Sequence, residues 1–354
     1  MKTEIIKIDP DNITPSLSDI KRAAEILKSG GLVVFPTETV YGLGGDATNP
    51  ASAEKIFSAK GRPKDNPLII HIENAEDAAL YAKTTPLYYR LAEKFMPGPL
   101  TVILESKDTV PYQTRGGLET VAVRCPENPV ARAFISLAGV AVAAPSANLS
   151  GSPSPTNASH VIDDMYGRVD VIIDGGECDF GLESTIVKIE NENTVTLLRP
   201  GKITLDELSL VCNVNVASAV VSELKAGEIA LSPGMKYRHY APASPVRLLD
   251  GERDDVLKYV KEQGNNKFAI LVYSEDKDYF AKQLPSASLY ELGSIKNESA
   301  QAHELFKILR DADKESFDVI YAPLPKAEGI GLALYNRLIR AAAHTIVNLR
   351  AANT

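Results

Sequence analysis

The sequence predicts an α/β fold with a twisted mixed sheet, followed by a smaller second α/β domain. Helical and strand signals alternate through the first two thirds of the 354 residues. Several strands there adjoin without a helix between them, which favours a mixed sheet over a purely parallel one. From about residue 222 the composition changes, and strand, helix and strand signals then repeat. That repeat is typical of a small open parallel sheet with helices over it.

The first elements carry clear start and stop signals. Residues 18–31 are amphipathic and close on a glycine pair, which predicts a helix, and the apolar residues 32–37 predict the next strand. Asn49 followed by Pro50 is typical of a helix start. The helix that they begin should end at Lys60, because Gly61 has the chemistry of a C-terminal stop.

The remaining elements follow from short apolar runs between turn residues. Further strands are predicted at residues 66–72, 98–105, 120–126, 139–148, 169–176, 183–190 and 194–201, with a helix at 129–139. In the second domain we predict strands at residues 245–250, 267–274 and 317–324, and helices at 254–264, 298–313 and 332–350. The predicted organisation is a first domain at residues 1–221, a linker or lid at 222–244 and a C-terminal domain at 245–354.

Composition excludes several classes of protein. Hydrophobic residues make up 44% and charged residues 24%, which is ordinary for a globular chain. The formal charge of −8 argues against a protein whose whole surface binds nucleic acid. Three cysteines without a C-x-x-C spacing indicate neither a disulfide framework nor a zinc knuckle. No signal peptide or membrane span is predicted, so we expect a cytoplasmic protein.

Familiar nucleotide and metal motifs are missing from the sequence. No G-x-x-x-x-G-K-[ST] occurs, and the glycines in YGLGGD and EGIGLAL do not complete G-x-G-x-x-G. The five histidines are isolated. A metal ion held by the protein alone is therefore not predicted. The segment EGIGLAL could place a nucleotide at a helix N-terminus, although packing of that helix on its own sheet is the favoured interpretation.

A cluster of cations follows the helix that ends at Lys60. Lys60, Arg62 and Lys64 precede a strand that is apolar except for His71. Cations at a helix C-terminus compensate its dipole, but that role needs one cation rather than three. A triphosphate would use all of them. His71 is either a core histidine whose polar atoms are hydrogen-bonded within the protein or a residue that contacts a ligand.

Other polar side chains stand at predicted strand ends. Thr37, Glu38 and Thr39 follow the strand at 32–37, at the end where open α/β sheets generally bind ligands. Arg124 ends another strand and fits a structural ion pair as well as a clamp for a carboxylate. The loop at 145–156 is either a simple Pro/Ser loop or a phosphate or ribose site. Its polar groups, and those at two later strand boundaries, are Ser146, Asn148, Ser150, Ser154, Ser184, Thr185 and Arg199.

Six segments in order resemble the YrdC domain. They are FPTETVYGLGGDA, KGRPKDNPLIIHI, TVAVRCP, PSANLSGSPSPT, ESTIV and LRPG. SPGMKYRHYAP and the α/β tail resemble the part that distinguishes the Sua5 branch of the Sua5/YrdC family. The resemblance covers nearly the whole chain. It implies an N-terminal YrdC-like twisted mixed sheet with an open cleft and a smaller Rossmann-like C-terminal domain.

The resemblance also implies an activity. Two-domain members are L-threonylcarbamoyladenylate synthases, nucleotidyltransferases that convert L-threonine, bicarbonate or CO2 and ATP into threonylcarbamoyl-AMP and pyrophosphate. The product serves the threonylcarbamoyladenosine modification of tRNA next to the anticodon. We therefore expect Mg2+ to arrive with ATP and a downstream tRNA threonylcarbamoyl transferase to be a partner. A weak tRNA contact and no membrane association are also expected.

Roles carry over by motif position. The resemblance implies charge neutralisation by Lys60 and Arg62, with Arg199 and Mg2+ assisting. Contacts to ATP fall to Arg62, Asn66, Thr120, Ser146, Asn148, Ser154, Arg199, Tyr237 and His239. Contacts to L-threonine fall to Thr37, Thr39, His71, Arg124, Ala144 through its backbone, and Ser184. No side chain is an obvious covalent nucleophile, so positioning and electrostatics should carry the reaction.

Alternatives remain for the linker and for the whole chain. The segment KYRHY at residues 236–240 is either a lid that keeps the intermediate dry or a solvated tether. The chain could instead be a non-enzymatic RNA-binding module, against which its acidic total speaks. A carbamoyl transferase for another acceptor is a third hypothesis, and its turnover would not respond to L-threonine.

Overall fold

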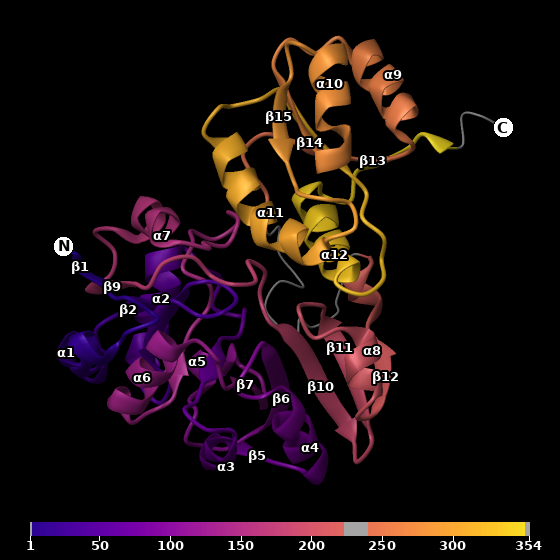
Figure 1. Ribbon diagram of the computed structural model, residues 1–354. Coiled ribbons are helices and arrows are strands. Elements are labelled where there is room, and N and C mark those ends of the chain that lie inside the picture. The colour runs from indigo at the N-terminus through magenta and orange to yellow at the C-terminus, as the bar shows by residue number, and fades with distance from the viewer. Residues whose placement is uncertain (1, 223–239, 351–354) are drawn as a thin grey trace. The chain divides into compact units, whose positions relative to one another are not determined.

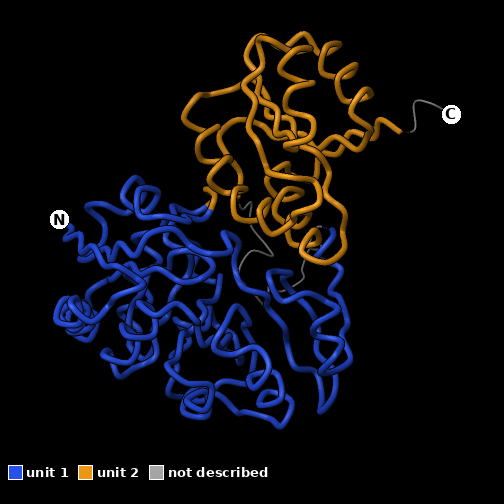
Figure 2. Tube along the Cα trace, viewed as in Figure 1, with its two compact units in different colours: residues 1–150, 154–236 blue, residues 151–153, 237–354 orange. Residues whose placement is uncertain are grey.

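The computed structural model describes residues 2–222 and 240–350. Two compact units divide the chain, and each is described by itself (Figure 2). The first comprises Met1–Ser150 and Ser154–Lys236, and the second comprises Gly151–Pro153 and Tyr237–Thr354. Most of the linker predicted at 222–244 falls on residues 223–239, outside the described residues, so the predicted domain boundaries stay a prediction.

The first unit is built on a large mixed sheet (Figure 1). Its strand order is β1-β9-β2-β3-β8-β4-β7-β6-β10-β11-β12, with β5 paired to β6. The strands are β1 (Glu4–Lys7), β2 (Val33–Phe35), β3 (Gly42–Asp46), β4 (Ile69–His71), β5 (Ala82–Lys83), β6 (Leu100–Ser106), β7 (Thr120–Arg124), β8 (Val142–Ala143), β9 (Val171–Asp174), β10 (Thr185–Asn191), β11 (Thr194–Arg199) and β12 (Asn213–Val216). Antiparallel pairs such as β2·β3 and parallel pairs such as β4·β7 occur in the same sheet, as predicted.

The helices of the first unit include the three predicted at residues 18–31, 50–60 and 129–139, which begin within one residue of the predicted start, and others that were not predicted. They are α1 (Leu17–Lys28), α2 (Pro50–Lys60), α3 (Ala78–Tyr81), α4 (Pro86–Phe95), α5 (Tyr112–Arg115), α6 (Pro129–Ala138), α7 (Ala158–Met165) and α8 (Leu205–Ser209), with short 3-10 turns η1 (Thr14–Ser16), η2 (Ala75–Asp77) and η3 (Ser218–Val220). Asn49 caps α2 by accepting a hydrogen bond from the backbone N–H of Ala51. Gly61 ends the helix in the left-handed conformation, with φ of 64°. Both signals therefore act as predicted.

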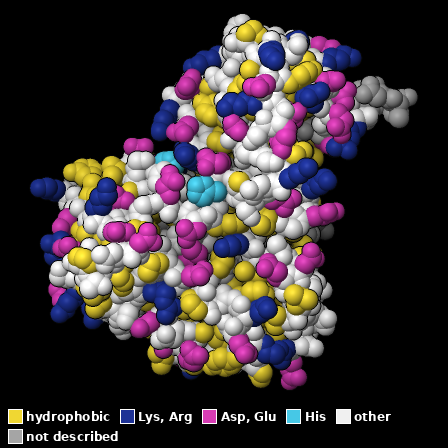
Figure 3. Space-filling view, in the orientation of Figure 1, with side chains coloured by type: hydrophobic (Ala, Val, Ile, Leu, Met, Phe, Trp, Pro, Cys, Tyr) yellow, Lys and Arg dark blue, Asp and Glu magenta, His cyan; other side chains and the backbone are white. Residues whose placement is uncertain are grey.

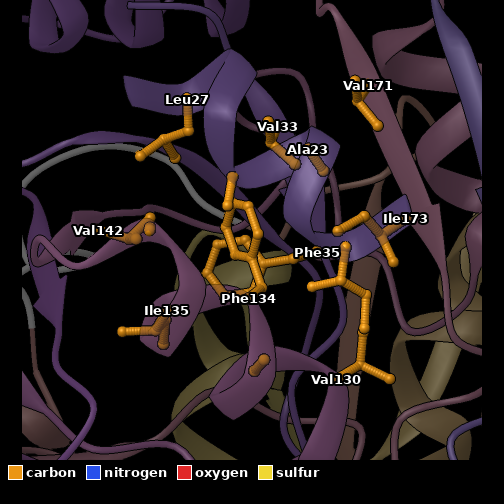
Figure 4. Packing of buried hydrophobic residues seen from close by; sticks show 14 of the residues in the cluster. Ala23, Leu27, Val33, Phe35, Val130, Phe134, Ile135, Val142, Val171 and Ile173 are labelled. Carbon is orange, nitrogen blue, oxygen red and sulfur yellow. The ribbon is translucent and has the colours of Figure 1, made fainter. Parts of the chain in front are cut away.

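A buried apolar cluster lies between two helices and one face of the sheet. Helices α1 and α6 pack there against β1, β2 and β9. Figure 4 shows the ring of Phe35 against that of Phe134, and their centroids are 5.3 Å apart. Val142 of β8 belongs to the same cluster and is aligned with His71 of β4. Because aligned residues on neighbouring strands point to the same face, this face continues past the helices onto the strands that carry the candidate site.

The second unit is a parallel sheet with the order β15-β14-β16-β13-β17. Its elements are β13 (Val246–Asp250), α9 (Arg253–Gln263), β14 (Phe268–Val272), η4 (Ser274–Asp276), α10 (Lys277–Gln283), β15 (Ser288–Glu291), α11 (Glu298–Asp313), β16 (Val319–Pro323), α12 (Gly331–Ala341) and β17 (Ile346–Asn348). Apolar side chains of α9 and α10 pack with Leu249, Ile270 and Tyr321 of the sheet. The predicted α/β fold class, a large mixed sheet followed by a smaller parallel one, is confirmed.

The last predicted helix was too long. Instead of running through residue 350, α12 ends at Ala341. Ala343 and His344 have φ of 46° and 60°, and β17 then pairs with β13. The helix start is also informative, because the backbone N–H of Gly331 donates a 2.9 Å hydrogen bond to the carboxylate of Glu298. A side-chain anion thus already accepts a hydrogen bond from one N–H group at this helix N-terminus, which speaks against the nucleotide interpretation of EGIGLAL.

Candidate active site

Strand register brings polar residues from distant segments into one row. His71 of β4 is aligned with Arg124 of β7, and Arg124 is aligned with Thr101 of β6. The row continues through Ile186 of β10 to Arg199 of β11. Aligned residues place their side chains on the same face of the sheet. The side chains of His71, Arg124 and Arg199, each at the end of its strand, therefore lie on one face. All five residues are buried.

Glu38 fixes the orientation of Arg124. Its Oε1 accepts a hydrogen bond from Nη2 of Arg124 at 2.6 Å. Its Oε2 accepts the backbone N–H groups of Glu127 and Asn128, just before α6, at 3.1 and 3.4 Å. The side chains of Arg124 and Glu38 are only 4% and 3% exposed. The pair therefore lies where water screens it little, and each charge needs the other.

Arg124 nevertheless retains donor capacity. Its Nε is buried and has no hydrogen-bond partner among the residues that the structure describes. An unsatisfied buried N–H of an ionised group costs free energy, unless a ligand supplies the acceptor. A guanidinium held by Glu38 on one side is suited to bind a carboxylate with its remaining donors. The sequence left a structural ion pair and a carboxylate clamp open, and the geometry allows both at once.

His71 lies beside Arg124 in neutral form. Burial, and then the nearby positive charge of Arg124, lower the pKa of His71 from 6.5 to about 3. Nδ1 lies 3.3 Å from the carbonyl oxygen of Val142, and the ring packs edge-on against Phe35. At neutral pH the imidazole therefore offers one donor and one acceptor without adding a third charge to the pair.

The loop after β2 is held by its own hydroxyls. Thr37 Oγ1 donates to the carbonyl of Val40 at 2.6 Å and accepts the backbone N–H groups of Thr39 and Val40. The hydroxyls of Thr37 and Thr39 are 2.9 Å apart. Both residues are buried, and the turn that they stabilise carries Glu38 toward Arg124.

Ser184 links two strands of the row. Its hydroxyl lies 2.8 Å from that of Thr101 and accepts a 3.1 Å hydrogen bond from Nη2 of Arg199. Nε of Arg199 donates to the carbonyl of Ser184 at 3.0 Å. Gly201 packs so closely behind this contact that a Cβ atom there would lie 2.5 Å from the backbone nitrogen of Thr185. Arg199 is therefore positioned by a packed backbone and two hydrogen bonds.

Lys60 binds the loop at 145–156. Its Nζ donates to the carbonyl of Ser146 at 2.6 Å, to the carbonyl of Asn148, and to Asn148 Oδ1 at 3.3 Å. The backbone N–H of Ser150 donates to the carbonyl of Lys60 at 2.9 Å. Ser146 Oγ in turn donates to Asn148 Oδ1 at 2.5 Å. The predicted contacts Lys60, Ser146 and Asn148 thus form one connected group.

The other two cations of KGRPKD, Arg62 and Lys64, lie in different environments. Arg62 is buried, and its Nε and Nη2 donate to the carbonyls of Asn66 and Pro67 at 3.2 and 2.9 Å. Lys64 instead has a side chain that is 71% exposed and forms an ion pair with Glu54. The idea that one triphosphate uses all three cations is not supported for Lys64, because surface exposure lets it pair with α2 instead.

The predicted residues fall at both ends of β4 and β7. Asn66 precedes β4 and Thr120 begins β7, whereas His71 and Arg124 end these strands. Thr120 and Arg124 are four residues apart, or about 13 Å along the strand, and alternation places them on the same face. Ala144, whose backbone N–H donates to the carbonyl of Ile69, extends this face onto the strand beside β4. The candidate site therefore spans the length of the strands.

Strand direction explains this division. We expected polar groups to gather at the carboxyl ends of strands, which lie at one edge only in a parallel sheet. Here β8 runs antiparallel to β4, so the loop that follows β8 lies at the amino end of β4. The cation and hydroxyl groups around Lys60 therefore lie at one edge, and Arg124 and Arg199 lie at the other.

A further polar contact of the described site joins Ser154 to Glu183. Ser154 Oγ donates to Oε1 of the buried Glu183 at 2.6 Å. Glu183 and Thr101 were not among the predicted residues. Glu183 adjoins Ser184 in ESTIV and could have been noticed there, whereas Thr101 lies within an apolar strand and carries no signal. Tyr237 and His239 lie outside the described residues, so their predicted roles have no structural description here.

Neither a metal-binding cluster nor a membrane-spanning helix occurs among the described residues. Among the described residues, no three or more His, Cys, Asp and Glu side chains are grouped so that they could hold a metal ion. No helix in the described part of the chain has the length and apolarity needed to cross a membrane. The three cysteines are free thiols and buried.

These features define a two-unit α/β protein whose buried polar groups converge on one sheet face. A family model for Sua5, YciO and YrdC, described as "Telomere recombination", matches residues 25–201. A second model, "Threonylcarbamoyl-AMP synthase, C-terminal domain", matches residues 203–343. The chain belongs to the Sua5/YciO/YrdC family.

Individual relatives agree over nearly the whole chain. The threonylcarbamoyl-AMP synthase of Pyrococcus abyssi is 43% identical over 339 residues, 93% of this chain and 96% of the relative. That of Bacillus subtilis is 38% identical over 361 residues, 98% of this chain and all of the relative. The crystal structure of P. abyssi Sua5 complexed with L-threonine matches with a TM-score of 0.88 and 41% identity, covering 98% of this chain and 99% of the other. The predicted family and enzyme class are confirmed.

Proposed function

We propose that the chain synthesises threonylcarbamoyl-AMP from L-threonine, bicarbonate or CO2, and ATP, with release of pyrophosphate. The names of its relatives and the L-threonine complex of P. abyssi Sua5 support this activity. The observation that carries the proposal is the guanidinium of Arg124, which is buried, oriented by Glu38 and still has an unpartnered Nε. Such a group is suited to an amino acid carboxylate.

The amino acid would bind at the carboxyl ends of β4 and β7. Arg124 would take its carboxylate, and neutral His71 would accept or donate one hydrogen bond beside it. The remaining contacts proposed for L-threonine are Thr37, Thr39, Ser184 and the backbone of Ala144. Buried hydroxyls can discriminate a side chain that carries a hydroxyl from one that lacks it, because an unpaired buried polar group is costly.

ATP would extend along the face toward the amino ends of the same strands. Contacts to it are proposed from Arg62, Asn66, Thr120, Ser146, Asn148, Ser154 and Arg199, with Tyr237 and His239 from the segment that is not described. Mg2+ would be bound mainly by the phosphate oxygens and would neutralise their charge. The described residues offer single carboxylates such as Glu183, rather than a cluster, as additional ligands.

The reaction forms two bonds in sequence. The amine of L-threonine attacks CO2, or bicarbonate with loss of water, and loses a proton to give a carbamate. A carbamate oxygen then attacks the α-phosphorus of ATP, and the bond to the pyrophosphate oxygen breaks. Lys60, Arg62 and Arg199 would stabilise the charge that accumulates as two anions approach. A buried site also protects the carbamate from water.

The product would be passed to a tRNA threonylcarbamoyl transferase, which modifies the adenosine next to the anticodon. A mixed anhydride of this kind is reactive, so a consuming enzyme must follow. Weak binding of tRNA by this chain stays a proposal. On the face shown in Figure 3, acidic and basic side chains of the described residues are interspersed, which favours an enzyme over an RNA-binding module.

Pyrophosphate release tests the proposal. Purified chain is incubated with ATP, Mg2+ and bicarbonate, with and without L-threonine. We expect release that depends on both L-threonine and bicarbonate, with a product of the mass of threonylcarbamoyl-AMP. Pyrophosphate release that does not depend on L-threonine would favour a carbamoyl transferase for another acceptor. Salt-dependent binding of tRNA without ATP consumption would favour the RNA-binding module.

A further inference from the structure

Thr101 carries a buried hydroxyl in an otherwise apolar stretch of β6. The strand reads LTVILES, and its residues from Leu100 to Leu104 are apolar apart from Thr101. The side chain of Thr101 is fully buried. Valine has nearly the same shape as threonine and would avoid the cost of burying a hydroxyl. The polar atom at this position therefore needs a reason other than packing.

Strand pairing places Thr101 between two residues that are proposed to contact L-threonine. Its aligned neighbour on β7 is Arg124. The Cβ atoms of directly aligned residues in an antiparallel pair are about 4.5–5.5 Å apart, so the two side chains are neighbours. On the other side, where β6 pairs with β10, the hydroxyl of Thr101 lies 2.8 Å from that of the fully buried Ser184.

The two hydroxyls hold one proton that finds no acceptor within the protein. Nη2 of Arg199 can only donate, so its 3.1 Å hydrogen bond occupies one lone pair of Ser184 Oγ. If Thr101 donates to the second lone pair, the proton of Ser184 is left over. If Ser184 donates instead, the proton of Thr101 is left over. Neither hydroxyl has a further hydrogen-bond partner in the described part of the chain.

A second donor without an acceptor stands on the neighbouring strand. Nε of Arg124 is buried and has no partner among the described residues. Two neighbouring buried donors are satisfied by a ligand that brings acceptor oxygens to them. The carboxylate of an amino acid has such oxygens, and the side-chain hydroxyl of L-threonine supplies another. An ammonium group has no lone pair and would satisfy neither donor.

We propose that Thr101 is a positioning residue that directs the proton of Ser184 to an acceptor oxygen of the bound amino acid. When Thr101 fills the second lone pair of Ser184 Oγ, the Ser184 proton can only point to the ligand. Hydrogen bonds in such a chain also polarise one another and strengthen the last donor. This inference rests on the proposed function, in which Ser184 contacts L-threonine. It adds a residue that no sequence motif indicates.

Calorimetric titration of L-threonine without ATP tests the role of Thr101. Thr101→Val removes the hydroxyl, and we expect the dissociation constant to rise about fivefold, as loss of one neutral hydrogen bond would do. Thr101→Ser keeps the hydroxyl and should stay within about twofold of wild type. Affinity of Thr101→Val for an unreactive ATP analogue should also stay within about twofold, because Arg199 keeps both hydrogen bonds to Ser184.

Combining Thr101→Val with Ser184→Ala separates positioning from packing. Ser184→Ala removes the proton that Thr101 directs and should raise the dissociation constant of L-threonine about tenfold. If Thr101 acts through Ser184, the added Thr101→Val should change that constant by less than about twofold. Effects that multiply, an unchanged affinity in Thr101→Val alone, or no rescue by Thr101→Ser would overturn the inference.

Thr3→Val is the matched control for the loss of a buried hydroxyl. The hydroxyl of Thr3 donates to the carbonyl of Val169 at 2.7 Å and accepts the backbone N–H of Gly167 at 2.8 Å, just before the edge strand β1. Its loss should lower the unfolding temperature at least as much as Thr101→Val and leave L-threonine affinity within about twofold of wild type. Equal weakening of L-threonine binding by both variants would mean that Thr101→Val acts through general destabilisation.

Two further measurements identify the acceptor and separate this inference from the proposed function. Equal weakening of L-threonine and α-aminobutyrate by Thr101→Val would place the hydrogen bond on the carboxylate. Weakening of L-threonine alone would place it on the side-chain hydroxyl, which α-aminobutyrate lacks. Pyrophosphate release that depends on L-threonine, with unchanged affinity in Thr101→Val, would refute this inference alone. The expected affinities, without such release by wild type, would refute the proposed function alone.

Discussion

Glu38 and Arg124 form a buried ion pair in which the carboxylate has no spare oxygen. Nη2 of Arg124 donates to Oε1 at 2.6 Å, and two backbone N–H groups occupy Oε2. The carboxylate is therefore anchored to the start of α6 as well as to the arginine. Arg124 is oriented by a group that itself cannot turn, which is how a guanidinium can be pre-organised for a ligand.

Replacing Glu38 should impair amino acid binding before nucleotide binding. Glu38→Gln keeps the shape but removes the charge that orients Arg124, so we expect affinity for L-threonine to fall by at least about tenfold. Affinity for an unreactive ATP analogue should change by less than about twofold. Calorimetric titration of each ligand measures both values.

Glu38→Ala should also cost stability. Breaking a buried ion pair by removing one partner typically costs about 3–5 kcal/mol, because the remaining charge is left uncompensated. Urea unfolding measures the loss, and Glu119→Ala serves as a control because the Glu119 side chain is 78% exposed. Similar unfolding free energies for the two variants would argue that Arg124 does not depend on Glu38.

His71 should make stability fall on acidification. Its pKa is lowered from 6.5 to about 3, so between these values the unfolded chain binds a proton that the folded chain refuses. The contribution of neutral His71 to the free energy of unfolding is fully present above pH 6.5 and decreases as the pH falls toward 3. Between these two pH values the free energy of unfolding falls by up to about 1.4 kcal/mol per pH unit, which corresponds to the uptake of one proton.

His71→Gln removes this titration and keeps a hydrogen-bonding side chain. Between pH 7 and pH 5, wild type should lose roughly 2 kcal/mol more unfolding free energy than the variant. Urea unfolding at the two pH values measures the difference, in which other titrating groups cancel. Equal losses would mean that His71 is protonated as readily in the folded protein as in the unfolded chain.

Local signals in the sequence predicted much of the fold. Asn49, Pro50 and Gly61 set the ends of α2 because capping and the left-handed stop depend on neighbouring residues alone. Short apolar runs predicted β4, β6 and β7 because burial of both faces leaves a continuous apolar pattern. By contrast, the end of α12 depends on pairing of β17 with β13, about a hundred residues away in the chain, and no local signal announced it.

The candidate site was predicted as residues but not as an arrangement. Glu38 and Arg124 are 86 residues apart, and their pairing depends on the order and direction of strands. The sequence could not tell that Arg62 turns inward while Lys64 remains at the surface, because both flank the same proline. Register and strand direction, which are tertiary properties, decide which polar groups share a face.

Arg62 and Lys64 therefore offer a matched pair of substitutions. Arg62→Ala should weaken ATP binding by at least about tenfold, because a buried cation is removed from the proposed phosphate site. Lys64→Ala should change it by less than about twofold, since the exposed pair with Glu54 contributes little. Titration with an ATP analogue at two salt concentrations measures both. Equal effects would mean that the cluster acts only through its overall charge.

Gly201→Ala should disrupt the support of Arg199. A Cβ atom at Gly201 would lie 2.5 Å from the backbone nitrogen of Thr185 and 2.7 Å from the carbonyl of Glu183, so the backbone must move. Overpacking of this kind costs about 1–3 kcal/mol, and it should also weaken binding of an ATP analogue because Arg199 follows the same backbone. Gly117→Ala is the control: Gly117 has a φ of 83°, which strains an alanine, but a Cβ atom there would meet no atom within 4 Å, so this variant should cost about 1 kcal/mol without affecting ATP. Thermal unfolding and nucleotide titration of both variants measure the contrast, and unchanged nucleotide affinity in Gly201→Ala would disconnect Arg199 from the site.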